Sequence, residues 1–178
     1  MCSILRLGAV YNIIWMAWLR LLIIHPMLII GHGWSEKQMP MTLEIIRLLI
    51  DFGFVVLIWA VQLVIYPSFV YYTKARLVEW HRSYTKRVTY IVLPLMFSQL
   101  IVSTIQLWQT INWYTCLSLI LILILWFLTF RVFVPLHFSI DYNRPVENVC
   151  KKLVTKNWSR TVLWTVLFLI SLLNFLWN

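Results

Sequence analysis

The segment TCLSLILILILWFLTFRVFV, residues 115–134, decides the fold class, because it is long and apolar enough to cross a membrane. A spanning helix needs about 20 apolar residues, since it rises ~1.5 Å per residue across a hydrocarbon layer of ~30 Å. Three further runs are of similar length: Leu48–Tyr66, Tyr90–Leu107 and Thr161–Trp177. Such continuous runs satisfy their backbone in lipid only as helices, and the alternating pattern of a membrane barrel is missing. We therefore predict an all-α integral membrane four-helix bundle.

The composition agrees with this class and places the bundle in the later part of the chain. Of the 178 residues, 62% are hydrophobic and only 12% are charged, which a water-soluble domain could not accommodate. We expect residues 41–178 to form the four-span domain. Residues 1–40 are apolar but interrupted by Arg20, so three alternatives stay open for them. They form an additional membrane helix, an interfacial helix, or an extension upstream of a natural start at Met41.

The basic residues predict how the bundle is oriented. The connections 71–87 and 131–160 contain five and six Lys or Arg residues, eleven of the fifteen in the chain. The connection 108–114 contains none. Short loops rich in Lys and Arg stay in the cytoplasm, so both basic connections are expected there. The positive charge suits anionic lipid headgroups, and no nucleic-acid recognition motif accompanies it. The lipid bilayer is thus the expected partner, and nucleic acid is not.

Polar side chains recur at helical spacing inside three of the four spans. Asp51, Trp59, Gln62 and Tyr66 share one helical face in the first span. Further stripes contain Gln99, Ser103 and Gln106 in the second span, and Asn157, Thr161, Thr165 and Ser171 in the fourth. These stripes should face one another, because polar groups exposed to lipid would lack partners. They form either interhelical hydrogen bonds that hold the bundle or a polar cavity. Asp51 is either a site residue or the partner of Arg47, one turn earlier.

A second polar group is expected where the spans reach the basic connections. Spans one and three end there and spans two and four begin there, so residues from all four should lie at one depth. The candidate site residues are His81, Tyr84, Arg87, His137, Asn157 and Arg160. Tyr66, Arg131 and Asp141 are expected at the same level.

Three interpretations of these candidates remain open. In the first, His81 and His137 bind a cofactor, either a metal ion or a haem iron, and with Asp141 they resemble a two-histidine, one-carboxylate iron site. The spacing does not say which metal or cofactor would bind. In the second, a histidine is the general acid or base for a lipid-soluble substrate, with Tyr84 and the arginines orienting it. In the third, these side chains only contact headgroup phosphates and neighbouring loops.

Four segments resemble a family of small bacterial membrane proteins that has no assigned activity. They are VQLVIYPSF (61–69), HRSYTKRVTYIVLPLM (81–96), VPLHFSIDY (134–142) and LVTKNWSRTVLWT (153–165). The shared elements are YP-F, H-x-x-Y-x-x-R, V-P-x-H and N-W-x-R-T-x-x-W, and the resemblance covers about residues 45–177. The chain departs from the family pattern at Lys156, where the family has threonine, and at Gln99, where members often carry an acid. The resemblance implies a bacterial inner-membrane protein whose motif residues are the candidate residues above.

The sequence therefore predicts a membrane-embedded enzyme or cofactor-binding protein with a His/Arg/Tyr/Asn site at its cytoplasmic face. The expected substrate is a hydrophobic or lipid-like small molecule. The alternative function is a non-catalytic structural subunit of a larger membrane complex, with membrane-protein partners or further copies of the chain. A channel or transporter is less expected, because one bundle of this size leaves little room for a pathway.

Overall fold

A computed structural model describes residues 38–141 and 146–177 of the chain. The chain divides into two units, Met1–Met39 and Pro40–Asn178, and the second contains the helices described below except for the first two residues of α2. The predictions for residues 1–40, as an extension or an additional helix, lie outside the described residues. Within the described part every long element is helical, which confirms the all-α fold.

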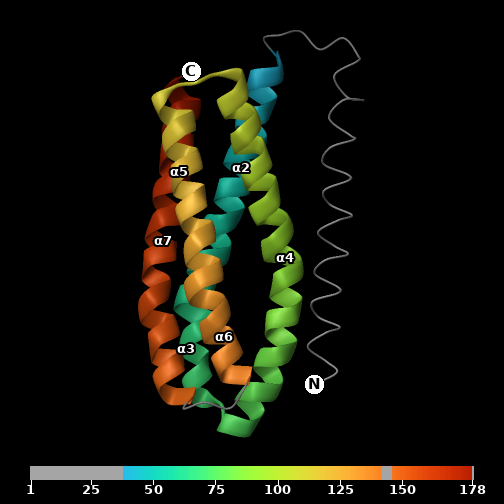
Figure 1. Cartoon of the computed structure of the whole chain (residues 1–178), viewed down its shortest axis with the longest axis vertical. Coiled ribbons are helices and arrows are strands. Elements are labelled where there is room, and N and C mark those ends of the chain that lie inside the picture. Colours follow the sequence, from blue (N-terminus) through green and yellow to red (C-terminus); the bar gives the residue numbers. More distant parts are fainter. Residues whose placement is uncertain (1–37, 142–145, 178) are drawn as a thin grey trace. The chain divides into compact units, whose positions relative to one another are not determined.

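Four helical rods make up the bundle (Figure 1). The first consists of α2 (Gln38–Ala60), the π-helical turn η1 (Val61–Ile65), α3 (Tyr66–Ser68) and the 3-10 turn η2 (Phe69–Tyr71). The second is α4 (Lys74–Gln109), which continues through Pro94. The third consists of α5 (Trp113–Leu128), the π-helical turn η3 (Thr129–Phe133) and α6 (Val134–Asp141). The fourth is α7 (Val146–Trp177). Each rod contains a segment that is long and apolar enough to cross a membrane, so the chain is an integral membrane protein.

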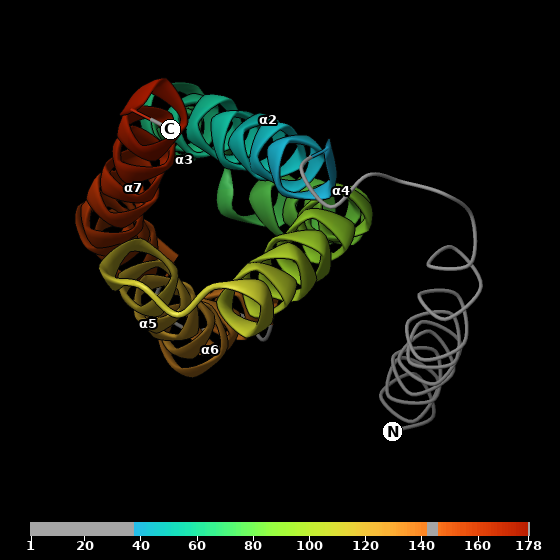
Figure 2. The same cartoon turned by 90° about the horizontal axis from the view of Figure 1, so that it is seen from above.

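Seen from above, the rods follow one another around the bundle in the order α2, α7, α5, α4 (Figure 2). Two ends of this bundle are distinguished below. The basic end holds the α3–α4 turn near Thr73, the end of α6 and the start of α7. The C-terminal end holds the short α4–α5 connection and Trp177. At that connection Asn112 caps α5, since its side chain accepts a hydrogen bond from the Thr115 backbone N–H at 2.9 Å.

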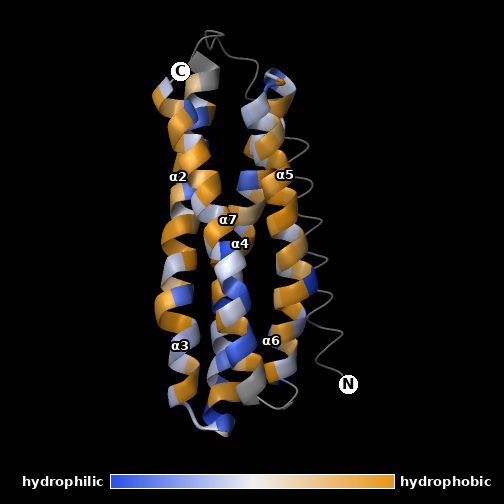
Figure 3. Ribbon diagram, turned by 90° about the vertical axis from the view of Figure 1, so that its left-hand side faces the viewer, coloured by the Kyte–Doolittle hydropathy of each residue, from blue (hydrophilic) through white to orange (hydrophobic). Residues whose placement is uncertain are grey.

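The bundle exposes apolar side chains and buries polar ones, as expected in lipid. Leu49, Leu63 and Ile120 are exposed, whereas Asp51 and Asn157 are completely buried. Apolar residues dominate the rods, with hydrophilic residues interspersed in the ribbon view (Figure 3). The prediction that the polar stripes face inward is confirmed.

An apolar layer separates the polar residues near the two ends. It contains Phe54, Ile58, Met96, Ile122, Leu125, Trp164 and Leu167, all at most 2% exposed. The Trp164 and Phe54 rings stack at its centre, with 4.7 Å between their centroids and 8° between their planes. The polar residues near the basic end and those near the C-terminal end therefore form two separate groups with apolar packing between them.

Candidate functional site

Two π-helical turns position the aromatic residues of the site near the basic end. In η1 the Tyr66 backbone N–H bonds the Val61 carbonyl, and in η3 the Val134 N–H bonds the Thr129 carbonyl. The next residue in each case is a proline, which has no N–H and whose ring crowds the preceding turn. A wider turn accommodates the proline and rotates the residues that follow it. Sequence motifs containing Tyr66-Pro67 and Val134-Pro135 thus set the helical phase of the site.

The side chains of Tyr66, His81, His137 and Asp141 form one continuous chain of hydrogen bonds, here called the histidine cluster. His81 Nδ1 lies 2.9 Å from Asp141 Oδ1, and His81 Nε2 lies 2.8 Å from His137 Nδ1. His137 Nε2 lies 3.1 Å from the Tyr66 hydroxyl. The four residues come from three rods, so the cluster exists only in the folded bundle.

The inventory of donors and acceptors fixes where the protons lie when both imidazoles are neutral. Asp141 as a carboxylate only accepts, so His81 carries its proton on Nδ1 and leaves Nε2 as an acceptor. His137 must then donate from Nδ1, which leaves its Nε2 to accept from the Tyr66 hydroxyl. Every proton therefore points toward Asp141, and every ring nitrogen has a partner. Asp141 is 24% exposed, whereas Tyr66 and His81 are buried. The series of hydrogen bonds therefore runs from the interior of the bundle toward its surface.

A buried arginine stands at the interior end of the histidine cluster. The Arg160 guanidinium is close enough to the Tyr66 and Tyr84 hydroxyls to interact electrostatically with both. It also lies over the Phe133 ring, 4.1 Å from the centroid, and 5.2 Å from the Trp164 ring. Arg160 forms no ion pair with a carboxylate in the described residues, and its Nε lacks a hydrogen-bond partner there. The cluster thus has a fixed positive charge at one end and the Asp141 carboxylate at the other.

The other predicted site residues take different positions. Asn157 is buried but donates to Gln62 Oε1 at 2.9 Å, in a contact between α7 and η1 beside the cluster. Tyr84 is half-buried and stacks on Trp80, with 5.0 Å between the ring centroids. Arg87 is exposed and takes part in none of the contacts described for the cluster. The structure therefore brings together His81, His137 and Arg160, places Tyr84 and Asn157 next to them, and leaves Arg87 outside.

Two members of the cluster, Tyr66 and Asp141, were expected at the same depth as the histidines but were not among the six candidate site residues. Tyr66 is also the last residue of the polar stripe that begins at Asp51, which placed its side chain inside the bundle. Asp141 lies four residues after His137, yet its partner is His81 on another rod. Arg131, expected at the same depth, is exposed.

The predicted role of His81 and His137 as cofactor ligands stays a prediction. Their mutual hydrogen bond and the bonds to Asp141 and Tyr66 occupy all four ring nitrogens. A metal or haem iron would have to replace one of these bonds. Within the described residues, no three His, Cys, Asp or Glu side chains are grouped so that they could hold a metal ion.

A surface hollow of about 260 Å³ reaches Tyr66 from the side of α7. It is lined by Tyr66, Val70, Cys150, Lys151, Val154 and Thr155. Its walls are mainly apolar, and Lys151 is the charged residue among them. A molecule with an apolar body could therefore reach the tyrosine at the interior end of the histidine cluster.

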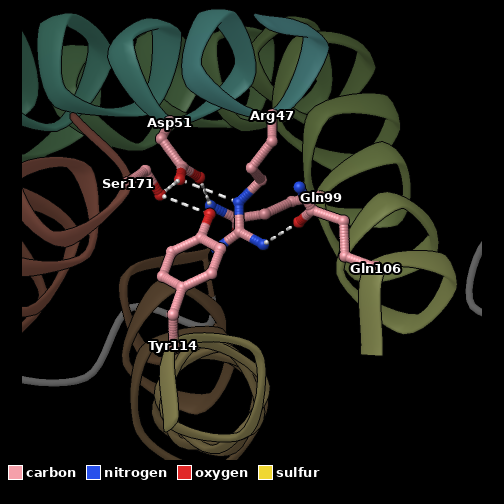
Figure 4. Close-up of polar contacts among 6 residues, drawn as sticks. All are labelled: Arg47, Asp51, Gln99, Gln106, Tyr114 and Ser171. Carbon is pink, nitrogen blue, oxygen red and sulfur yellow. Dashed lines mark hydrogen bonds and ion pairs between the residues drawn. The ribbon is translucent and has the colours of Figure 1, made fainter. Parts of the chain in front are cut away.

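A second polar site, here called the aspartate network, lies near the C-terminal end (Figure 4). Asp51 accepts hydrogen bonds from Arg47 Nε at 2.8 Å, Gln99 Nε2 at 2.6 Å and Ser171 Oγ at 2.5 Å. The Tyr114 hydroxyl donates to Ser171 Oγ at 3.3 Å, and Arg47 Nη1 lies 3.5 Å from Gln106 Oε1. All six residues are buried and they come from all four rods. Of the two alternatives for Asp51, its ion pair with Arg47 is confirmed.

Comparison of the chain with protein-family models, with curated proteins and with solved structures finds no match. The resemblance to the bacterial membrane family therefore stays a prediction, and function has to be argued from the site itself.

Proposed function

We propose that the protein is a membrane-embedded acid–base enzyme whose histidine cluster moves a proton to and from a lipid-like substrate. The observation that carries this proposal is the unbroken hydrogen-bonded chain from Asp141 to Tyr66, with Arg160 at its interior end. A structural contact between helices needs one or two such bonds. Four titratable groups in series, beside a buried cation, are instead typical of proton transfer.

The proton movements balance without any additional group. Each of the three protons in the chain moves one step toward Asp141, which becomes a carboxylic acid while Tyr66 becomes a phenolate. The net charge of the histidine cluster does not change. The Arg160 guanidinium stabilises the negative charge on the Tyr66 oxygen. The phenolate then takes a proton from an acidic C–H or O–H bond of the substrate and returns it to another substrate atom, after which the reverse shift restores the chain.

Access through the hollow beside Tyr66 supports a substrate that lies in the membrane. The hollow opens between the first and fourth rods at the basic end, where an amphiphile would place its polar group near Lys151. Its apolar part would remain among lipid chains. In this proposal His81 and His137 transfer protons, Tyr66 contacts the substrate, and Arg160 stabilises charge. Tyr84 and Asn157 position these groups, and Arg87 has no direct role.

The basic connections support the proposed location of this site. Lys and Arg are concentrated at the end of the bundle that holds the histidine cluster, so that end would face the cytoplasm of a bacterial inner membrane. Protons released or taken up at Asp141 would then exchange with the cytoplasm.

The proposal is tested by comparing membrane lipids from cells that produce the wild-type protein, Tyr66→Phe or Tyr90→Phe. Tyr66→Phe keeps the ring and removes the hydroxyl, whereas Tyr90 is 61% exposed on α4 and serves as the matched control. We expect mass spectrometry to show a lipid product in wild-type and Tyr90→Phe cells, reduced about 10²- to 10⁴-fold in Tyr66→Phe cells. Identical lipid profiles in all three would contradict an enzymatic role for the cluster.

The aspartate network supports a second candidate function, a structural subunit of a larger membrane complex. It joins the four rods through a fully buried ion pair and the hydrogen bonds around it. Co-purification of the protein with a fixed membrane partner, unchanged in Tyr66→Phe, would favour this function over the enzyme.

A further inference from the structure

A second hollow, of about 520 Å³, lies at the turn between the first rod and α4. It is lined mainly by aromatic and charged side chains, of which Tyr72, Arg76, Glu79 and Trp80 matter here. The two candidate membrane spans Met41–Tyr71 and Lys74–Gln109 meet at this turn. The hollow therefore lies at the boundary of the bilayer, where lipid headgroups are found.

The aromatic wall of this hollow is held in place before any ligand binds. Trp80 stacks on Tyr72 on one side, with 5.3 Å between centroids, and on Tyr84 on the other, with 5.0 Å. The edge of Phe69 contacts it as well, at 5.7 Å between centroids. The stack with Trp80 holds Tyr72 in place, so the Tyr72 ring loses little conformational freedom when a ligand packs against it.

The hollow also presents two charges of opposite sign. Arg76 and Glu79 are three residues apart on α4, so their side chains emerge next to each other. Within the described residues, neither forms an ion pair with the other or with any third group. A cation and an anion side by side, beside aromatic rings, are complementary to a ligand that carries both charges.

We propose that this hollow binds the headgroup of a zwitterionic phospholipid. Arg76 binds the phosphate, for which the planar guanidinium provides paired donors. Glu79 binds the ammonium group through charge pairing, and the exposed ring of Tyr72 adds a cation–π contact. The acyl chains run along the exposed apolar surface next to the hollow, where Val70 is 70% exposed and Tyr71 is 87% exposed. This site is separate from the histidine cluster and does not depend on the proposed enzyme activity.

Native mass spectrometry of the purified full-length protein tests this inference. Phosphatidylethanolamine, phosphatidylcholine and phosphatidylglycerol with identical acyl chains are titrated against wild type, Arg76→Gln and Glu79→Gln. We expect wild type to prefer the two zwitterionic lipids over phosphatidylglycerol. Glu79→Gln should weaken binding of the zwitterionic lipids about two- to fivefold and leave phosphatidylglycerol unchanged, while Arg76→Gln should weaken all three by a similar factor.

Two controls make the result decisive. Lys86→Gln removes an exposed basic residue of α4 that does not line the hollow, and it should leave all three affinities unchanged. Glycerophosphoethanolamine, which has the headgroup without acyl chains, should bind more weakly than the intact lipid. Equal binding of the three lipids by wild type, or equal losses in Lys86→Gln and Arg76→Gln, would overturn the headgroup site. If glycerophosphoethanolamine binds as tightly as the intact lipid, the inference that the ligand is a membrane lipid is wrong.

Discussion

Replacement of Asp51 by leucine should be among the most destabilising single changes in the bundle. Asp51 is fully buried, and it accepts hydrogen bonds from Arg47, Gln99 and Ser171. Its loss leaves the buried Arg47 guanidinium without an anion, and breaking a buried ion pair in this way costs ~3–5 kcal/mol. The two lost amide and hydroxyl bonds add ~0.6 kcal/mol each, the usual value between membrane helices.

Replacement of Arg47 by leucine should cost less than replacement of Asp51. A carboxylate left alone can take up a proton and become neutral, whereas a guanidinium remains charged. The double replacement removes both charges, and leucine side chains pack well in this environment. It should therefore cost only ~1–2 kcal/mol, mainly from the polar groups that lose their partners.

The free energy of unfolding of the three variants and wild type is measured by denaturant titration of the protein in detergent micelles or bicelles. The expected order of stability is wild type, double variant, Arg47→Leu, Asp51→Leu. Leu49→Ala, at an exposed position of α2, controls for a general effect of substitution on this helix. A double variant less stable than either single one, or an Asp51→Leu cost below ~1 kcal/mol, would refute the buried-charge reasoning.

Three further predictions concern the histidine cluster, the orientation and the packing between rods. Nitrogen-15 NMR should find the neutral imidazoles of His81 and His137 both protonated on Nδ1, and an Nε2–H tautomer of either would contradict the deduced order of protons. Reporter domains fused after Trp113 and after Lys152 should lie on opposite sides of the membrane, and a shared side would exclude this topology. Asn157→Leu should lower stability by ~0.6–1.7 kcal/mol in the same unfolding assay, and a neutral effect would show that its interhelical bond contributes nothing.

Hydropathy located the four spans but underestimated the lengths of their helices. The second span was predicted as Tyr90–Leu107, whereas α4 begins at Lys74, and the fourth was predicted from Thr161, whereas α7 begins at Val146. The reason is that hydropathy identifies only the part of a helix that is apolar enough for lipid. The polar first turns of α4 and α7 come before that apolar part. They carry His81 and Asn157, so the site lies in helical segments that hydropathy alone would assign to loops.

The amino-acid sequence is enough to predict the fold class, the four spans and the inward direction of the polar stripes. These features follow from the cost of exposing polar groups to lipid, which acts on each helix separately. It also predicted that His81, His137 and Arg160 lie at one depth, because consecutive spans alternate in direction. Neither result required knowledge of how the helices pack.

Which of these residues are in contact depends on how the helices pack and cannot be read from their spacing. The π-helical turns before Pro67 and Pro135 rotate Tyr66 and His137 by an amount that a regular helical period does not contain. Packing then sets His81 between His137 and Asp141, while Arg87 faces outward. A hydrogen bond requires its atoms to lie within about 3 Å of each other, whereas sequence spacing fixes only a face and a depth. The chain of proton-carrying groups is therefore a property of the folded bundle.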